Sequence, residues 1–259
     1  MEQSSFQQQP ARRFRLRLDG ATLKRFGCLT LFLYTLRMSV FRLGLIGAGR
    51  MSPAELAERM ASDPRILRLS GFASVLQLAG ALGIPIFAYL LVEGFLHTSS
   101  YRRYLLSVAA AALVSEVPYD FAMSGKLVDW TDQNLLLSYT ICLILLYGLR
   151  MAESRSGFSG HLVRGCILAA SLLWAMLLRA RFGVVSAALC AAYYLLRDRT
   201  ALKILAGCGI SSFYLSAPLS GLLLWMYDGT RGNIRFKYLY YALYPAHLLI
   251  LGAAARMVS

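Results

Sequence analysis

Residues 83–98 read GIPIFAYLLVEGFLHT, an apolar run that ends with an acid and an imidazole four positions apart. Side chains at that spacing share one face of a helix, so Glu93 and His97 are expected to lie side by side. Pro85 lies inside the run, and a membrane helix tolerates a proline where neighbouring helices satisfy the freed backbone groups. The stretch therefore predicts a membrane helix whose end carries either an anchor at the bilayer surface or part of an active site.

The composition is that of an integral membrane protein. Of the 259 residues, 58% are hydrophobic and 15% are charged, and the mean hydropathy is +0.55. A soluble domain averages about 25% charged residues. The formal net charge of +14 is best explained by Lys and Arg at the ends of membrane helices, because no polar domain is present to carry a basic face. We therefore expect no nucleic-acid partner.

Apolar runs predict an all-α fold, a polytopic transmembrane helical bundle of about eight spans. The runs cover residues 26–46, 71–96, 104–123, 134–148, 163–178, 182–196, 201–226 and 238–257. Two of them have about 15 residues, which is short for a full crossing. Loops are short, and no second domain or internal repeat is visible, which disfavours an inverted-repeat transporter.

The chain is expected to consist of a tail, residues 1–22, and a single transmembrane domain, residues 23–259. The tail is rich in glutamine and arginine and is predicted to be disordered and cytoplasmic. The first apolar run is long enough to span, which favours a membrane helix over a cleaved signal. In the loop at 48–69, Ser52 and Glu55 form a capping box around Pro53, so short helices on the membrane interface are expected.

Lys and Arg counts place the N-terminus in the cytoplasm by a modest margin, and an even number of spans places the C-terminus there too. His97, Arg102 and Arg103 would then lie at the cytoplasmic surface. Charges inside membrane segments are costly, so each indicates either function or structural pairing. For Glu93 and His97 the structural alternative is an interfacial anchor paired with the two arginines.

The motif SEVPYD at 115–120 places Glu116 and Asp120 on one helical face inside a span. These carboxylates could serve a proton pathway or bind a cation, but structural pairing with Lys126 or with an arginine is favoured. Asn134 is expected to be an ordinary N-cap.

The last span, KYLYYALYPAHLL at 237–249, carries His247 near mid-membrane, behind Tyr244 and Pro245. A histidine at that depth is either a buried hydrogen-bonding partner or a catalytic base.

Motifs with a defined chemistry are absent from the sequence. There is no glycine-rich phosphate loop, HExxH or GxSxG. The five cysteines lie in apolar stretches without a CxxC pair, so neither a metal site nor a disulfide framework is predicted. They are Cys28, Cys142, Cys166, Cys190 and Cys208. The residues alone leave the reaction open.

Several stretches, in this order, resemble the TraX family: PIFAYLLVEGFLHT from residue 85, YRRYLL from 101, SEVPYD from 115, RFGVVSAALCAAYYLLR from 181 and KYLYYALYPAHLL from 237. That family consists of bacterial inner-membrane proteins whose namesake acetylates the N-terminus of conjugative pilin, and it is similar to multispanning acyltransferases that take acetyl-CoA from the cytoplasm. The resemblance implies an inner-membrane acyltransferase with acetyl-CoA as donor. The acceptor would be an amine or hydroxyl, on a membrane or pilin-like protein in contact with lipid.

Carried over onto this chain, the resemblance marks Pro85, Phe87, Glu93, Gly94, His97, Thr98, Glu116, Pro118, Asp120, Asn134, Gly183, Tyr244, Pro245 and His247. His97, oriented by Glu93, is our first candidate for the catalytic base, and His247 is the second. Arg102 and Arg103 are candidates for binding the CoA phosphates. The remaining polar positions are predicted to form a substrate-binding or structural site, namely Glu116, Asp120, Asn134 and Tyr244.

Two departures from the family pattern affect this prediction. In the first span the family typically has an Asp-His pair, whereas this chain has Tyr34 and Thr35. An arginine and a phenylalanine of the family are replaced by Ala81 and Ile84. If the pair is the family's general base and the arginine binds CoA or the oxyanion, this chain has lost both. A scaffold or assembly factor without catalysis is therefore the main alternative, and a small transporter that uses the intramembrane carboxylates is the next.

Overall fold

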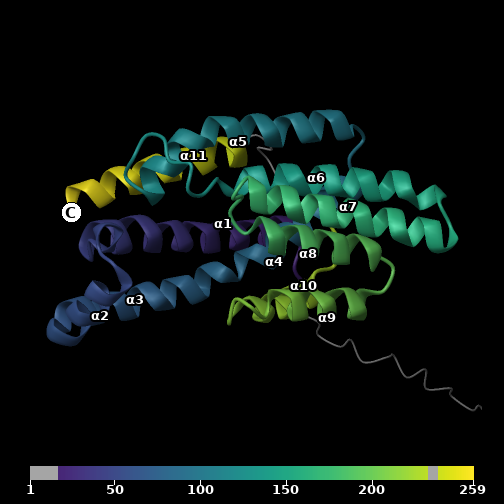
Figure 1. Ribbon diagram of the computed structural model, residues 1–259. Helices are drawn as coiled ribbons and strands as arrows, with labels where there is room; N and C mark the ends of the chain where they lie inside the picture. The colour runs from purple at the N-terminus through teal and green to yellow at the C-terminus, as the bar shows by residue number, and fades with distance from the viewer. Residues whose placement is uncertain (1–16, 233–238) are drawn as a thin grey trace, which may run out of the picture.

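The computed structural model describes residues 17–232 and 239–259, which form a bundle of helices with no strand in either range (Figure 1). The α-helices are α1 (Gly20–Leu36), α2 (Pro53–Ser62), α3 (Pro64–Ala81), α4 (Gly83–Leu96), α5 (Tyr101–Met123), α6 (Leu135–Met151), α7 (Gly157–Leu177), α8 (Gly183–Leu195), α9 (Thr200–Ser211), α10 (Ser220–Met226) and α11 (Leu239–Met257). A π-helix, η1 (Arg37–Leu45), continues α1, and single 3-10 turns precede α2, α7 and α10. The predicted all-α bundle is confirmed.

Five segments of the described chain are long and apolar enough to cross a membrane: Gly20–Leu45, Pro64–Leu96, Tyr101–Met123, Leu135–Ser154 and Gly157–Leu177. Two of the predicted spans need correction. The helix in 182–196 has only 13 residues, and the run at 201–226 is two short helices, α9 and α10, separated by a turn at 212–216. Hydropathy did not reveal this turn because Phe213, Tyr214 and Leu215 keep the run apolar between its two serines. The hydroxyl of one of them, Ser216, donates to the carbonyl of Leu78 at 2.6 Å.

The N-terminal segments partly follow the prediction. Residues 1–16 of the expected tail lie outside the described residues. Helix α1 begins at Gly20, within the range expected for the tail, and Asp19 caps it by accepting from the backbone N–H of Thr22 at 2.8 Å. The capping box is present, with Ser52 and Glu55 each bonded to the other's backbone N–H at the start of the exposed helix α2.

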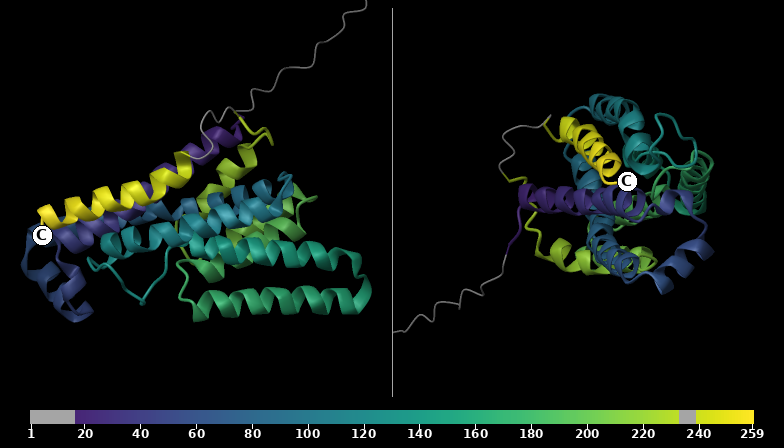
Figure 2. Two further views of the ribbon diagram at one scale, coloured as in Figure 1. Left: turned by 90° about the horizontal axis from the view of Figure 1, so that it is seen from above. Right: turned by 90° about the vertical axis from the view of Figure 1, so that its left-hand side faces the viewer.

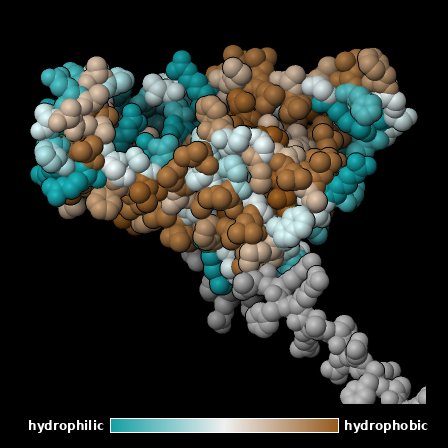
Figure 3. All heavy atoms as spheres, turned by 90° about the horizontal axis from the view of Figure 1, so that it is seen from below, coloured by the Kyte–Doolittle hydropathy of each residue, from teal (hydrophilic) through white to brown (hydrophobic). Residues whose placement is uncertain are grey.

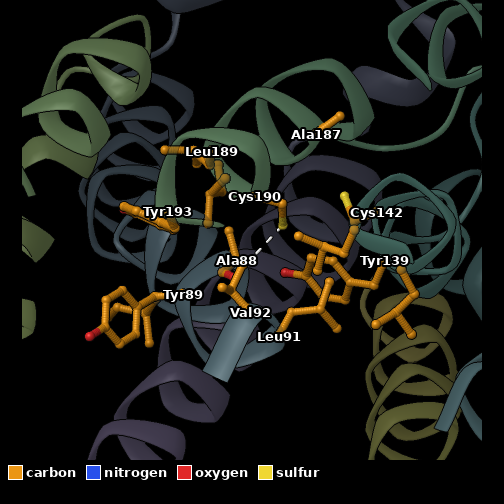
Figure 4. Close-up of a cluster of buried hydrophobic side chains, with 14 of the residues drawn as sticks. Ala88, Tyr89, Leu91, Val92, Tyr139, Cys142, Ala187, Leu189, Cys190 and Tyr193 are labelled. Carbon is orange, nitrogen blue, oxygen red and sulfur yellow. Dashed lines mark hydrogen bonds between the residues drawn. The ribbon is translucent and has the colours of Figure 1, made fainter. Parts of the chain in front are cut away.

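Helix α4 is the centre of the hydrophobic core. Nine of its 14 residues are buried, as expected of a helix that is apolar on almost all sides. It packs against α8, α1 and α6, and Figure 4 shows side chains of α4, α6 and α8 interleaved there. Cys142 and Cys190 lie wholly inside this core. All five cysteines are free thiols, so no disulfide framework forms.

Helix α1 runs antiparallel to α3 and α4, and small residues let the backbones approach closely. A Cβ added at Gly80 would lie 3.0 Å from the Cα and 3.1 Å from the backbone N of Tyr34. On the other side of α1, helix α11 runs alongside α1 and η1 (Figure 2), where the hydroxyl of Ser39 donates to the carbonyl of Leu251 at 2.8 Å. The first span is thus enclosed by α3, α4 and α11 near its middle.

Replacing Gly80 with alanine should destabilise the bundle, because the new methyl group meets the backbone of Tyr34 and forces α1 away from α3. We expect a lower thermal midpoint in detergent and a loss of about 1–3 kcal/mol. Gly71→Ala is the matched control on the same helix, since nothing lies within 4 Å of its added Cβ. That control should leave the midpoint unchanged or slightly higher, because alanine favours helix. Equal losses in both variants would contradict the close α1–α3 contact.

Candidate functional site

A cavity of about 650 Å³ lies at the middle of the two longest candidate spans. Tyr34 and Arg37 line it from the middle of Gly20–Leu45, and Gln77 and Ala81 line it from the middle of Pro64–Leu96. The other walls come from the turns between helices. If the long segments cross the bilayer, this cavity lies near mid-depth.

The turns that reach the cavity are at 131–134, 178–182 and 212–216. Non-helical backbone at membrane depth is tolerated only where it is buried in protein or lines a cavity. Two of these turns satisfy each other's backbone groups: Gln133 N–H donates to the carbonyl of Arg179, and Arg181 N–H donates to that of Gln133, both at 3.0 Å. The hydroxyl of Ser138 donates to the carbonyl of Arg181 at 2.6 Å.

The turn at 178–182 has an unusual backbone. Arg179 and Phe182 have φ values of 50° and 56°, and in the described part of the chain they are the two non-glycine residues with positive φ. Such conformations cost about 1–3 kcal/mol each and are found most often at functional sites. The nearby π-helix η1 is a second rare backbone feature of that kind. The turn lines the cavity through Phe182, and the π-helix lines it through Arg37.

An ion pair between Asp132 and Arg181 joins these turns. The hydroxyl of Tyr119 donates to the same carboxylate oxygen at 3.0 Å, and the second terminal nitrogen of Arg181 donates to the hydroxyl of Tyr34. The guanidinium also lies 5.2 Å from the ring centroid of Phe182. The pair is about one-quarter to one-third exposed, at 26% for Arg181 and 30% for Asp132. It is therefore held by partners from α1, α5 and two turns.

The second arginine of the cavity, Arg37, lacks an acidic partner. One of its terminal nitrogens contacts the sulfur of Met38 at 2.8 Å, and its buried Nε has no hydrogen-bond partner in the described chain. No carboxylate of the described residues lies within ion-pair distance of it. Among the residues that the structure describes, the cavity is thus lined by two guanidinium groups and one carboxylate, Asp132.

His247 lies beside the first span. Its Nε2 is 3.2 Å from the hydroxyl of Thr35, and its Nδ1 is 3.0 Å from the carbonyl of Leu243. A carbonyl only accepts, so Nδ1 carries a proton in this contact, and in the neutral ring Nε2 is then the acceptor that faces the Thr35 hydroxyl. The hydroxyl of Thr35 is also 3.1 Å from the carbonyl of Leu31. An imidazole in this state can act as a base.

Glu116 and Asn134 form a separate contact on α5 and α6. The amide nitrogen of Asn134 donates to Glu116 and, at 2.8 Å, to the carbonyl of Ala112. Its oxygen accepts from the backbone N–H groups of Leu136 and Leu137, which confirms the N-cap. The other carboxylate oxygen of Glu116 is buried without a partner in the described residues. Tyr244 is buried in the main hydrophobic core cluster.

Asp120 accepts a hydrogen bond of 2.8 Å from the backbone of Asp129. Lys126, the expected partner of the carboxylates, instead lies 3.8 Å from Asp129. Hydrogen bonds from the side chain and backbone of Thr131 hold the pKa of Asp129 below its usual value, so this loop carboxylate stays ionised at neutral pH. Asp120 therefore fixes the loop after α5.

Glu93 and His97 lie at the other end of α4. The imidazole Nδ1 is 2.8 Å from the carbonyl of Glu93 and 3.6 Å from its carboxylate, but the His97 side chain is 74% exposed. Glu93 lines a smaller cavity of about 190 Å³ together with Arg197 and Lys203. Glu93 is nine positions after Ile84, which lies in the wall of the larger cavity, so the two are about 14 Å apart along the helix axis.

The structure therefore brings Glu93 and His97 together but leaves His247 at a different place in the bundle. Arg102 and Arg103 are exposed on the first turn of α5, close in sequence to His97. The sequence prediction missed Tyr119, Asp132 and Arg181 as site residues. The sequence did contain one indication, because Asp132 and Arg181 are charges beside apolar runs. It does not show which helix packs against each of them.

Comparison with known proteins gives a family match over most of the chain. The family described as TraX protein matches residues 59–254. No curated protein and no solved structure matches this chain.

Asp132→Asn should destabilise the protein, because it leaves the Arg181 guanidinium half-buried without a counter-charge. Since the pair is partly exposed, we expect the free energy of unfolding to fall by about 1–3 kcal/mol, less than for a fully buried pair. The measurement is the thermal midpoint in detergent. The control Lys126→Gln breaks a surface pair and should cost at most about 0.5 kcal/mol. Adding Arg181→Gln to Asp132→Asn should cost less than the sum of the two single changes; strict additivity would argue against the ion pair.

Proposed function

We propose that this chain, which belongs to the TraX family, transfers an acetyl group from acetyl-CoA to an amine or hydroxyl of a membrane-associated acceptor. The observation that best supports this proposal is the imidazole of His247, which is held by the carbonyl of Leu243 at Nδ1 and faces the hydroxyl of Thr35 with Nε2 at 3.2 Å. A catalytic base needs a lone pair at a fixed position, and Nε2 of the neutral ring would offer one to an acceptor that takes the place of the Thr35 hydroxyl.

The polar groups around Tyr34 and Thr35 also favour activity. By resemblance, the family has an aspartate and a histidine at these two positions. In this chain an imidazole, His247, contacts Thr35, and a carboxylate, Asp132, shares the guanidinium of Arg181 with Tyr34. An imidazole therefore contacts one replaced position, and a carboxylate is connected to the other through Arg181, although both come from other segments.

The reaction would proceed by direct transfer. Nε2 of His247 takes the proton of the acceptor amine or hydroxyl as its nitrogen or oxygen attacks the thioester carbonyl. The carbonyl oxygen becomes an oxyanion, which N–H donors beside the imidazole would have to stabilise. The carbon–sulfur bond then breaks, and the imidazolium returns its proton to the CoA sulfur. The products are the acetylated acceptor and free CoA.

The donor would arrive from the end that carries His97. With the N-terminus in the cytoplasm, this end is cytoplasmic, where Arg102 and Arg103 are exposed and could bind the CoA phosphates. In this arrangement His97 and Glu93 belong to the donor side of the protein and His247 is the base. A scaffold without catalysis is the alternative, favoured by the replacement of the family Asp-His pair with Tyr34 and Thr35.

The three histidines of the chain allow a matched test of the base. His247→Gln should lower acetyl transfer by about 10²–10⁴-fold, whereas His161→Gln should retain it, because this exposed side chain has no role in the proposed site. His97→Gln should raise the concentration of acetyl-CoA that is needed rather than abolish transfer. The assay is incorporation of labelled acetyl groups from acetyl-CoA into membranes that contain the protein, which requires no known acceptor. Equal incorporation in wild type and His247→Gln would contradict the assignment of His247.

Binding of CoA separates an enzyme from a scaffold. A ligand at about 100 times its Kd should stabilise the folded protein by about 2.7 kcal/mol, which raises the thermal midpoint in detergent. The double change Arg102→Gln and Arg103→Gln should reduce this shift. The control double change Arg65→Gln and Arg68→Gln removes two exposed charges from the start of α3 and should not. A wild-type protein with no CoA-dependent shift would favour the scaffold.

A further inference from the structure

The larger cavity has positive charge that no described side chain neutralises. Asp132 is already paired with Arg181, and Arg37 has no carboxylate partner among the described residues. The buried Nε atoms of both arginines also lack hydrogen-bond partners there. An unpaired cation at membrane depth is costly, and so is an unsatisfied buried donor. A bound anion would offset both costs.

The geometry of the donors restricts the anion. A guanidinium presents its N–H groups in a planar fork that matches the two oxygens of a carboxylate or phosphate. Arg37 and Arg181 line the same cavity. The cavity volume of about 650 Å³ falls within the roughly 300–1,000 Å³ that is usual for ligand pockets. An oxyanion with room for further substituents therefore fits.

The rim of the same cavity is apolar and exposed. Phe213 and Leu215 line the cavity and are 84% and 83% exposed, and Leu78 beside them is also exposed. Because these residues stand at the middle of the long spans, the medium that they face is lipid. Figure 3 shows that hydrophobic residues cover much of the face that carries α3, α9 and α10, whereas hydrophilic residues gather toward the ends. The cavity is thus open to the hydrocarbon region and cationic inside.

We propose that this cavity binds the carboxylate or phosphate of a lipid-soluble amphiphile, with the oxyanion between Arg37 and Arg181 and its apolar chain against Phe213 and Leu215. Such a ligand would enter the cavity laterally from the hydrocarbon region of the bilayer, without passing through water. The further step, that this ligand is the acetyl acceptor, rests on the proposed function. The ligand would then also carry a hydroxyl or an amine. The binding itself does not depend on catalysis.

Native mass spectrometry of the full chain in detergent tests the site, with phosphatidic acid as the anionic probe and diacylglycerol as a neutral probe with the same acyl chains. We expect phosphatidic acid to bind at least about tenfold more tightly, as loss of one charged hydrogen-bonding partner predicts. Arg37→Gln should lose about tenfold in affinity for phosphatidic acid. The matched control is Arg42→Gln, which removes an exposed arginine from the same π-helix and should change little.

A second variant guards against misfolding of Arg37→Gln. Phe213→Ser alters an exposed rim residue and should weaken the binding of phosphatidic acid while leaving the thermal midpoint unchanged. Inorganic phosphate serves as the soluble oxyanion and should bind much more weakly than phosphatidic acid. Equal affinity of phosphatidic acid for wild type and Arg37→Gln would contradict an anion site at Arg37. Inorganic phosphate that binds as tightly as phosphatidic acid would contradict recognition of a lipid-soluble ligand.

The two proposals can fail separately. Acetyl transfer that is absent while phosphatidic acid binding depends on Arg37 would contradict only the proposed function. Acetyl transfer that depends on His247 while phosphatidic acid binds no better than diacylglycerol would contradict only the amphiphile site.

Discussion

The ion pair between Asp132 and Arg181 is the interaction on which the middle of this bundle depends. Several helices end or begin near the middle of the long spans. The backbone groups of their turns need hydrogen-bond partners there, because the bilayer core offers no water. The turns at 131–134 and 178–182 solve this problem by bonding to each other, and the ion pair holds them together. Because Tyr119 and Tyr34 bond to the same pair, the long helices α5 and α1 are tied to the turns as well.

Helix α4 separates two polar regions. Its buried middle packs against α8 and α6, and one end borders the larger cavity through Ile84 while the other carries Glu93 beside Lys203. Its apolar surface keeps the charged groups of the two regions apart, because a charge within that core would have no partner.

Local contacts were predictable where sequence spacing alone determines them. The i,i+4 contact of Glu93 and His97, the capping box at Ser52 and the N-cap at Asn134 all form, since a helix dictates which neighbours meet. The contact between Thr35 and His247 joins residues 212 positions apart, and Arg181 reaches Tyr34 across 147 positions. No spacing rule predicts such pairs, because they depend on which helices pack together.

The sequence by itself determined the all-α class, the membrane environment and most helix locations, because apolar runs and caps act within one helix. It also marked the costly charges, Glu93, Glu116 and Asp120 among them. Only the tertiary structure decided which charges are paired, where the run at 201–226 breaks and which histidine stands next to the first span. The physical reason is that hydropathy measures transfer of a segment into lipid, whereas a buried turn or charge is stabilised by partners from distant segments.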